Sequence, residues 1–283
     1  MDTLIKGKGR EHTISTDGPV TIIGEKINPT GRKKLAQALR DLDLEFVRDL
    51  ARLQAAAGAN LLDVNVGVPG LDDVDLLPRV VQAVCATVDL PLCIDTTNPT
   101  ALAAALRVAP GKPLVNSVNG EEASLGSILP LVKDRGAAVI GLTMDENGIP
   151  GDPETRAAIA EKIVNRAVRI GIPAEDVLID PLVLTVGADD QAGAITLRTI
   201  ELVRARLGVN INLGATNVSF GLPERITLNQ AFLALSIRAG ATCMITDAAA
   251  LGLTIRAAEL VLGRDEYAVH YISLFRVQQK VKS

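Results

Sequence analysis

The sequence is poor in the side chains that most often carry out nucleophilic catalysis or bind zinc. It has two histidines, His12 and His270, which lie near the two ends of the chain. Its three cysteines, Cys85, Cys93 and Cys243, are far apart and form no Cys-x-x-Cys motif. Zinc sites are built mainly from histidine and cysteine, and many hydrolase serines sit in a Gly-x-Ser-x-Gly turn that is missing here. We therefore expect no bound metal and no histidine- or cysteine-based active site.

A basic surface, a long apolar segment and a signal peptide are also missing. The formal net charge is -4, so no basic stripe for nucleic acid is expected. No stretch of about 18 residues is apolar enough to span a membrane, and residues 1–10 are too polar for a signal peptide. Scattered, odd-numbered cysteines are typical of reduced thiols. We expect a cytoplasmic protein that binds neither nucleic acid nor membranes.

Aromatic residues are scarce, although hydrophobic residues are not. Aromatics make up 2% of the sequence and tryptophan is absent, whereas hydrophobic residues make up 48%. The core must therefore be built from alanine, valine, leucine and isoleucine. Branched aliphatic residues in continuous runs are typical of parallel strands that are buried on both faces.

Short apolar runs alternate with longer helix-like segments along the chain. The expected strands are 20–26, 60–66, 92–95, 114–118, 137–144, 177–180, 210–214 and 242–247. The expected helices are 44–57, 74–88, 100–108, 125–135, 153–170, 192–207, 228–239 and 254–262. Five of these helices end at a glycine, which favours the left-handed conformation of a helix C-cap: Gly58, Gly136, Gly171, Gly208 and Gly240.

This alternation predicts an α/β fold, a single (β/α)8 TIM barrel. Alternating strands and helices give a parallel sheet, eight units close a barrel, and such a barrel needs about 250 residues. We expect an N-terminal arm at 1–19, the barrel at 20–263 and a C-terminal helical tail at 264–283. An open, doubly wound sheet is the alternative, but its Gly-x-Gly-x-x-Gly fingerprint is absent after the first strand, at 24–31.

Polar side chains gather where the predicted strands end, which is where barrel enzymes place their active sites. They are Glu25, Lys26, Asn28, Asp63, Asn65, Asp95, Asn116, Asn119, Asp180, Asn217 and Asp247. Carboxylates only accept hydrogen bonds, whereas carboxamides donate and accept. Together they match a neutral heterocycle whose edge alternates donors and acceptors, such as a pterin. Leaving such a group buried and unpaired costs about 1–3 kcal/mol, which gives selectivity.

Several of these residues also have a purely structural interpretation. Asp95 precedes a run typical of a helix cap, Asp180 precedes a proline and fits a turn, and Asn116 could satisfy loop backbone groups. We interpret Asp247 as a structural or capping residue and Lys26 as a solvated or loop-bridging one.

The strand ends carry a family resemblance. The chain resembles the methyltetrahydrofolate:corrinoid methyltransferases, whose pterin-binding barrel is related to the folate module of cobalamin-dependent methionine synthase and to dihydropteroate synthase. The matching stretches, in the family's order, are 23–31 (IGEKINPTG), 62–67 (LDVNVG), 92–98 (LCIDTTN), 115–119 (VNSVN), 140–144 (IGLTM), 178–182 (LIDPL) and 216–220 (TNVSF).

The resemblance implies how a folate would bind. Asp95, Asn116 and Asp180 would hold the pyrimidine edge of the pterin. Asn217, on a mobile loop after the seventh strand, would hydrogen-bond to N5, the nitrogen that bears the methyl group. The family often has serine before this asparagine, where this chain has Thr216.

The resemblance also implies a polar network directed at N5. Glu25, Asp63 and Asn65 would extend this network. A tertiary amine is a poor leaving group, so N5 must gain a proton or positive charge as its methyl group departs. We hypothesise that Asn217 stabilises that charge and that a proton is relayed from water through Asp63 and Glu25.

The methyl acceptor or donor implied by the family is the cobalt of a corrinoid. No Asp-x-His-x-x-Gly motif and no corrinoid-binding region is apparent, so the resemblance implies a corrinoid (cobalamin) carried on a separate partner protein. The implied substrate is tetrahydrofolate or methyltetrahydrofolate, within one-carbon metabolism. The family also implies a homodimer.

Three other functions remain open from the sequence. A dihydropteroate synthase would need lysine or arginine near its pyrophosphate leaving group. The segments 213–217 and 245–248 carry neither, although Arg225 and Arg256 lie farther on. A non-catalytic pterin-binding subunit is the second alternative. The third is a phosphate-handling barrel lyase, which would need a Schiff-base lysine at a strand end, where Lys26 is the nearest candidate.

Overall fold

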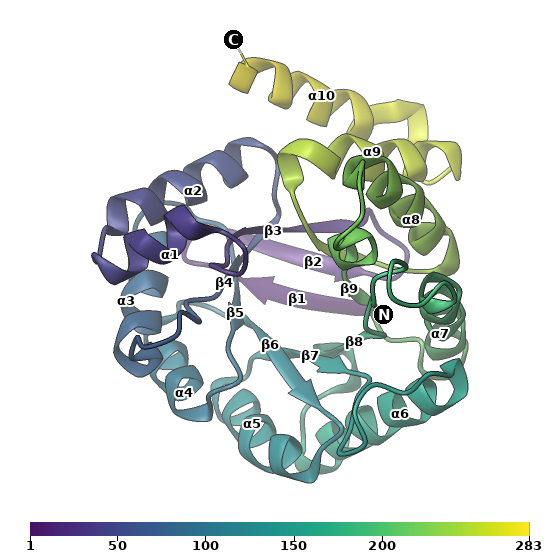
Figure 1. Cartoon of the computed structure of the whole chain (residues 1–283), viewed down its shortest axis with the longest axis horizontal. Coiled ribbons are helices and arrows are strands. Elements are labelled where there is room, and N and C mark those ends of the chain that lie inside the picture. Colours follow the sequence, from purple (N-terminus) through teal and green to yellow (C-terminus); the bar gives the residue numbers. More distant parts are fainter. Residues whose placement is uncertain (283) are drawn as a thin grey trace.

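The chain folds into a ring of helices around a parallel sheet (Figure 1). The computed structural model describes residues 1–282 and the side chains of residues 1–279. The strands of the ring are β3 (Thr21–Ile27), β4 (Leu61–Val64), β5 (Leu92–Asp95), β6 (Leu114–Asn119), β7 (Ala138–Leu142), β8 (Val177–Asp180), β9 (Asn212–Gly214) and β10 (Cys243–Thr246). The helices are α1 (Lys33–Arg40), α2 (Leu44–Ala56), α3 (Asp73–Cys85), α4 (Pro99–Val108), α5 (Glu122–Arg135), α6 (Pro153–Ile170), α7 (Ala192–Leu207), α8 (Arg225–Ala239), α9 (Ala248–Val261) and α10 (Val269–Lys282).

The sheet closes on itself. Its strand order is β8-β7-β6-β5-β4-β3-β10-β9, and a parallel bridge between Ile179 and Ile211 joins the two outer strands. The (β/α)8 barrel predicted from the sequence is therefore confirmed. All strands run in the same direction, so their carboxyl ends meet at one mouth of the barrel.

Two apolar layers hold the barrel together. The larger one lies between the strands and the surrounding helices. The smaller one fills the interior and comprises Ile5, Ile14, Ile23, Leu61, Cys93, Leu114, Ala138, Ile140, Leu178 and Cys243. Because the strands are buried on both faces, their sequences read as continuous apolar runs.

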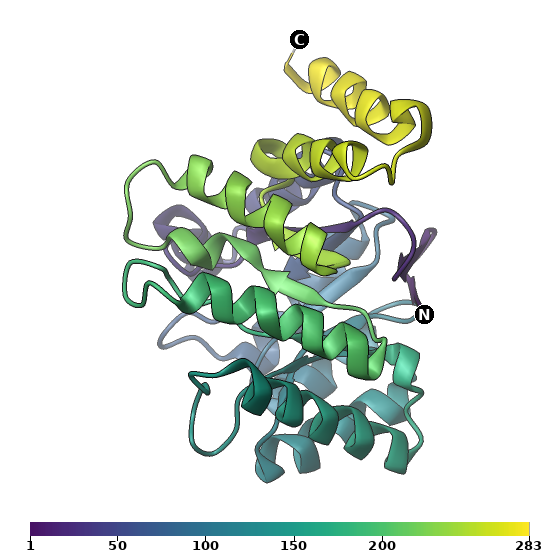
Figure 2. The ribbon, with the colours of Figure 1, turned by 90° about the vertical axis from the view of Figure 1, so that its right-hand side faces the viewer.

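An antiparallel hairpin closes the amino end of the barrel. β1 (Asp2–Lys6) and β2 (Glu11–Ser15) form it, and their Ile5 and Ile14 side chains are fully buried in the interior layer. Figure 2 shows this hairpin at the end opposite the long loops that follow the strands. The loops are thus left free to form a site.

The structure differs from the sequence prediction mainly outside the barrel strands. The expected arm at 1–19 contains the hairpin, and α1 was not predicted. α8 begins three residues before the expected start at 228. α10 falls in the expected tail and packs outside the ring against α9, with Leu274 close to Gly58 and Gly252 (Figure 1). The last residue of that tail, 283, lies outside the described residues.

Four of the five glycines that were expected to end helices are C-caps, and the fifth, Gly58, has positive φ and directly follows Ala57, the C-cap of α2. Gly136, Gly171, Gly208 and Gly240 are the C-caps of α5, α6, α7 and α8, and all have positive φ. At Gly240 φ is 119°, a value that a residue with a Cβ atom rarely adopts. Within the described residues, no helix combines the length and the apolar character needed to cross a bilayer.

Candidate active site

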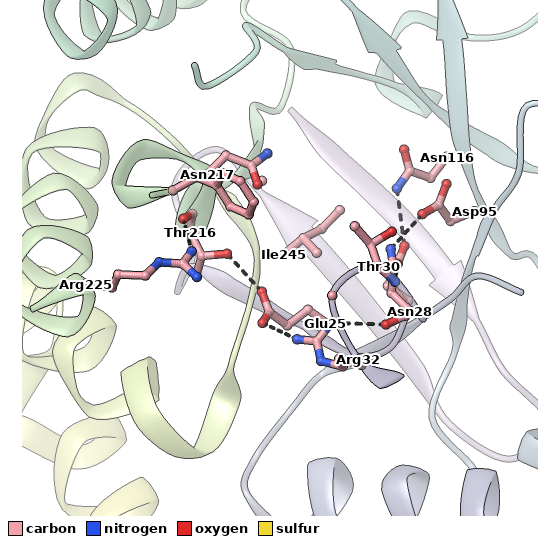
Figure 3. A pocket seen from close by; sticks show the side chains of 14 residues that line it. Glu25, Asn28, Thr30, Arg32, Asp95, Asn116, Thr216, Asn217, Arg225 and Ile245 are labelled. Atoms are coloured by element: carbon pink, nitrogen blue, oxygen red, sulfur yellow. Dashed lines mark hydrogen bonds and ion pairs between the residues drawn. The ribbon is translucent and has the colours of Figure 1, made fainter. Parts of the chain in front are cut away.

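A cavity of about 440 Å³ opens at the mouth formed by the carboxyl ends of the strands (Figure 3). Five of the seven residues predicted from the sequence line it: Glu25, Asp63, Asp95, Asn116 and Asn217. They come from four strands and one loop that are distant in sequence. The fold therefore brings most of the predicted site together.

Asp95 and Asn116 form one wall of the cavity. They are direct neighbours in the register of β5 and β6, and both point into the cavity in Figure 3. Asn28 donates a long hydrogen bond of 3.4 Å from Nδ2 to Asp95 Oδ2. Burial raises the pKa of Asp95 to about 6, while a hydrogen bond from Asn65 acts in the opposite direction. A carboxyl group and a carboxamide thus stand side by side, ready to pair with complementary donors and acceptors.

Asp63 lies deeper in the same wall. It is 2% exposed, and Asn116 Nδ2 donates to its Oδ1 at 3.2 Å. Burial raises the pKa of Asp63 well above its usual range, and the nearby charge of Asp95 raises it further. Asp63 is therefore protonated more readily than an exposed carboxylate, which suits it to proton transfer.

Asp180 and Asn65 do not line the cavity, although both lie close to it. Asp180 is 6% exposed and accepts hydrogen bonds at 2.8 Å from the Leu182 amide and from Asn212 Nδ2. The amide of Gly214, which does line the cavity, also lies against it. Burial raises the pKa of Asp180 to about 6 despite these bonds. Asn65 Oδ1 accepts from the Gly67 amide at 2.7 Å.

Glu25 stands at the centre of a polar chain across the cavity mouth. Arg32 Nη2 pairs with its Oε1 at 2.7 Å, and Thr216 Oγ1 donates to its Oε2 at 3.1 Å (Figure 3). These contacts join the loop after β3 to the loop after β9. Thr216 thus keeps the hydroxyl function of the family's usual serine and uses it to hold Glu25.

Asn217 faces Asp95 and Asn116 from the opposite side of the cavity (Figure 3). It lies in a single 3-10 turn, η2 (Ala215–Ser219), that directly follows β9. A Cβ atom on Gly214 would come within 3.1 Å of Asn217 Nδ2, so glycine leaves room for this side chain. The asparagine is therefore presented by a short, tightly turned segment at a strand end.

Of the two candidate arginines, which lie beyond strands seven and eight in the sequence, one reaches the cavity wall. Arg225, at the start of α8, donates from Nη2 to the Thr216 carbonyl at 2.9 Å and from Nε to Ser219 Oγ at 3.0 Å. The other candidate, Arg256, is buried and pairs with Glu259 at 2.6 Å, so it does not reach the cavity. Because Arg225 supplies a positive charge, a phosphate-binding function is not excluded on the ground that the cavity has no cation.

Sequence reasoning missed much of the outer rim. Asn28, named among the polar strand ends but given no role, also lines the cavity, and the unpredicted lining residues are Thr30, Gly31, Arg32, Gly214, Thr216, Phe220, Arg225 and Ile245. Most belong to the loops after β3 and β9. The turn sequence at 28–31 directly after a predicted strand was a usable signal, because every loop in that position faces the mouth.

Two residues interpreted as structural are confirmed as such. Asp247 is the N-cap of α9 and accepts from the amides of Ala249 and Ala250. Lys26 bridges to Asp247 from β3. Within the described part of the chain, no three histidine, cysteine, aspartate or glutamate side chains are grouped so as to hold a metal ion.

Comparison with known proteins places these features in a family. A family model described as "pterin binding enzyme" matches residues 24–247. The chain is 32% identical over 263 residues to a methylcorrinoid:tetrahydrofolate methyltransferase of Eubacterium limosum, covering 90% of this chain and 96% of that one. It is 32% identical over 248 residues to the methionine synthase of Mycobacterium tuberculosis, covering 83% of this chain but 21% of that one.

Solved structures show the same barrel at lower identity. A dihydropteroate synthase of Xanthomonas albilineans superposes with a TM-score of 0.70 at 22% identity, covering 93% of this chain and 99% of that one. The Yersinia pestis dihydropteroate synthase superposes with a TM-score of 0.68 at 18% identity, covering 92% of this chain and 99% of that one. At these identities the likeness supports the fold alone.

Proposed function

The chain belongs to the pterin-binding enzyme family, and on this premise we propose that it is a methyltransferase of the EC 2.1.1 class. It moves a methyl group between N5 of methyltetrahydrofolate and the cobalt of a corrinoid that a partner protein carries. The observation that carries the proposal is the cluster formed by the buried Asp63 and the half-buried Asp95 and Asn116 at the carboxyl ends of adjacent strands. The 32% identity with a methyltransferase over 90% of the chain supports the same reaction.

The cluster suits the pyrimidine edge of a pterin. That edge donates from N3–H and the 2-amino group and accepts at O4. Asp95 accepts the donors, and Asn116 satisfies both a donor and an acceptor. Asp180 lies behind the wall, held by Asn212 and Leu182, and becomes a third partner once the ligand reaches it. Each matched group avoids about 1–3 kcal/mol of desolvation.

Asn217 acts at the other end of the ring system. With the pyrimidine edge against Asp95 and Asn116, the far ring that contains N5 points toward Asn217 across the cavity. When the N5–methyl bond breaks, its electron pair stays on N5, so N5 must be protonated or bear positive charge beforehand. A carboxamide oxygen accepts a hydrogen bond from protonated N5 and therefore stabilises that state. A reduced corrinoid supplies the nucleophile that takes the methyl group.

Asp63 and Glu25 deliver the proton that N5 needs before the methyl group departs. Burial raises the pKa of Asp63, so this carboxyl group takes up a proton more readily than an exposed one and is the side chain of the wall best suited to pass it on. Glu25, paired with Arg32 and Thr216 at the mouth, connects the interior to solvent. Asn65 accepts a hydrogen bond from the loop after β4, and its hydrogen bond to Asp95 lowers the pKa of that carboxyl group. We therefore assign Asn65 a supporting role in binding.

The same proposal covers assembly and location. The chain works as a homodimer in the cytoplasm, docks a corrinoid protein over the barrel mouth, and binds neither nucleic acid nor membrane. The net charge of -4 supports the lack of nucleic-acid binding, and the three free thiols support a reducing compartment. The molar mass in solution, measured by light scattering, tests the dimer, because a value near the 29.7 kDa of one chain would contradict it.

Dihydropteroate synthase remains the enzyme alternative. Arg225 in the cavity wall removes the electrostatic argument against it, since a pyrophosphate leaving group could pair there. The methyltransferase is favoured because the identity is 32% with that enzyme and 22% or lower with the synthases reported above. Formation of dihydropteroate from its pterin pyrophosphate and p-aminobenzoate would favour the alternative.

Folate binding is the direct test of the site. Titration calorimetry with methyltetrahydrofolate should show one binding site per chain in the wild-type protein. Asp95→Ala should weaken binding by at least about tenfold, because it leaves the pyrimidine donors unpaired. Asp145→Ala, in the loop after β7 and outside the cavity lining, is a matched control that should leave affinity unchanged. Equal affinity in Asp95→Ala and wild type would contradict the assigned wall.

A further inference from the structure

The two arginines of the cavity wall differ in their electrostatic partners. Arg32 forms an ion pair with Glu25 at 2.7 Å. Arg225 donates only to a carbonyl and a hydroxyl, and no carboxylate of the described residues forms a salt bridge with it. Arg225 therefore carries an uncompensated positive charge at the mouth of a cavity whose inner wall is acidic.

An exposed aromatic ring lies beside that arginine. Phe220 is one of four phenylalanines in the chain, lines the cavity and is 65% exposed. The guanidinium carbon of Arg225 lies 5.6 Å from its ring centroid. An exposed aromatic face next to an unpaired cation forms a surface that suits a flat ring bearing a nearby carboxylate.

The chemistry of a folate directs its tail to this surface. In a folate, C6 is bonded to N5 and carries the benzoyl-glutamate tail. If Asn217 lies at N5, as in the proposed function on which this step rests, the tail leaves the ring beside Asn217. Phe220 follows Asn217 by three positions, and Arg225 begins α8 at the same side of the mouth (Figure 3).

We propose that Phe220 and Arg225 form the binding subsite for the benzoyl-glutamate tail of the folate. Phe220 packs against the benzoyl ring, and the Arg225 guanidinium pairs with a glutamate carboxylate. Arg225 retains its bonds to Thr216 and Ser219 while doing so, because its Nη1 is not used by them. The subsite makes the enzyme select a folate over a bare pterin.

Arg225 also braces the turn that carries Asn217, and the experiment must separate the two roles. A brace acts on every ligand equally, because it affects Asn217 and N5. A tail subsite acts only on ligands that have the tail. Shortening the ligand therefore distinguishes the roles, and the bare pterin also tests the proposed function by itself.

The experiment measures dissociation constants of the full chain for three reduced, N5-methylated ligands: the folate, the pteroate as its primary amide, which has neither the glutamate nor any carboxylate, and a 6-methylpterin without the benzoyl group. The wild type should bind them in that order of decreasing affinity. Arg225→Gln should weaken folate binding about tenfold, to the level of the pteroate, and leave the other two ligands within twofold. Phe220→Leu should weaken folate and pteroate about fivefold and spare the pterin. Arg198→Gln, on the outer surface of α7, is the matched arginine control.

The possible outcomes test both the tail subsite and the proposed function. Equal weakening of all three ligands by Arg225→Gln would make Arg225 a brace and overturn the subsite. Equal affinity of wild type for folate and pteroate, with no loss at high salt, would overturn it without any variant, since an exposed ion pair is screened. Wild-type binding of the bare pterin with no tail preference would leave the proposed function standing alone. Failure to bind any of the three ligands would overturn both.

Discussion

At the scale of single residues, Asn217 is the side chain whose proposed role is most specific to the chemical step. Asn217→Ala should lower the single-turnover rate of methyl transfer by about 100-fold, as removal of one preorganised polar group in a transition state does. The affinity for methyltetrahydrofolate should change by no more than about threefold. Stopped-flow rates and titration calorimetry measure the two quantities.

A matched control for this variant is Asn119→Ala. Asn119 also ends a strand, β6, but it lines a neighbouring recess rather than the cavity. Its substitution should leave the rate unchanged. Equal losses of rate and affinity in Asn217→Ala would mean that the asparagine binds substrate in the ground state only, and the assigned role would be wrong.

Asp180 should make the protein less stable at neutral pH. Its folded-state pKa is raised to about 6 by burial, so the folded protein disfavours the ionised form. A raised carboxyl pKa gives stability that is present below the unfolded pKa of about 3.9 and is lost as the pH rises through about 6. Asp180→Asn should therefore raise the free energy of unfolding by about 1–3 kcal/mol at pH 8.

Urea unfolding at pH 8 and at pH 4 tests this. The advantage of Asp180→Asn should shrink between pH 6 and pH 4 as the wild-type carboxyl group becomes protonated. Asn212 has an unpaired Oδ1 within the described residues, so its carboxamide can turn to accept from the new asparagine. Folate binding should fall at the same time. A variant that is no more stable than wild type at pH 8 would show that the carboxylate is well solvated in the folded chain.

At the scale of the elements, the sequence predicted the barrel strands well because their burial leaves a clear pattern. β8 and α6 occupy the same residues that were expected, 177–180 and 153–170. The hairpin was missed because its strands are short and bury one isoleucine each from the interior layer, Ile5 and Ile14. α1 was missed because it has eight residues and no side-chain cap at Arg32.

The candidate site likewise contains some residues that the sequence predicts and others that it does not. Asp63, Asp95 and Asn116 lie within strands, so the fold alone fixes their direction. Arg225 and Phe220 depend on the path of the loop after β9, which no periodicity encodes. The positions of these loop residues in the site could therefore be assigned only from the structure.

The hairpin should stabilise the barrel without affecting its mouth. Ile5→Ala should lower the free energy of unfolding by about 2–4 kcal/mol, since it leaves a cavity in a fully buried layer. Ile149→Ala, at an isoleucine that is 37% exposed, is the control and should cost much less. Folate affinity should stay within twofold in both variants. A large loss of folate affinity in Ile5→Ala would mean that the two ends of the barrel are coupled.

At the scale of the whole molecule, the two ends of the barrel have different roles, because one stabilises the fold and the other holds the candidate active site. Its amino end is plugged by the hairpin and an apolar layer, whereas its carboxyl end holds buried carboxyl groups with raised pKa values. Such groups cost stability and are retained where they bind or react. In the proposed reaction the open mouth is also the face on which the corrinoid protein docks, because the methyl group has to reach the cobalt directly.

The most direct measurement is an anaerobic methyl transfer assay with free cob(I)alamin. The full chain is mixed with methyltetrahydrofolate, and the absorbance of Co(I) is followed as it converts to methyl-Co(III). We expect conversion that depends on the protein and is slowed about 100-fold in Asn217→Ala. A folded wild-type chain that binds methyltetrahydrofolate but transfers no methyl group to or from the corrinoid, whether free or protein-bound, would contradict the proposed reaction.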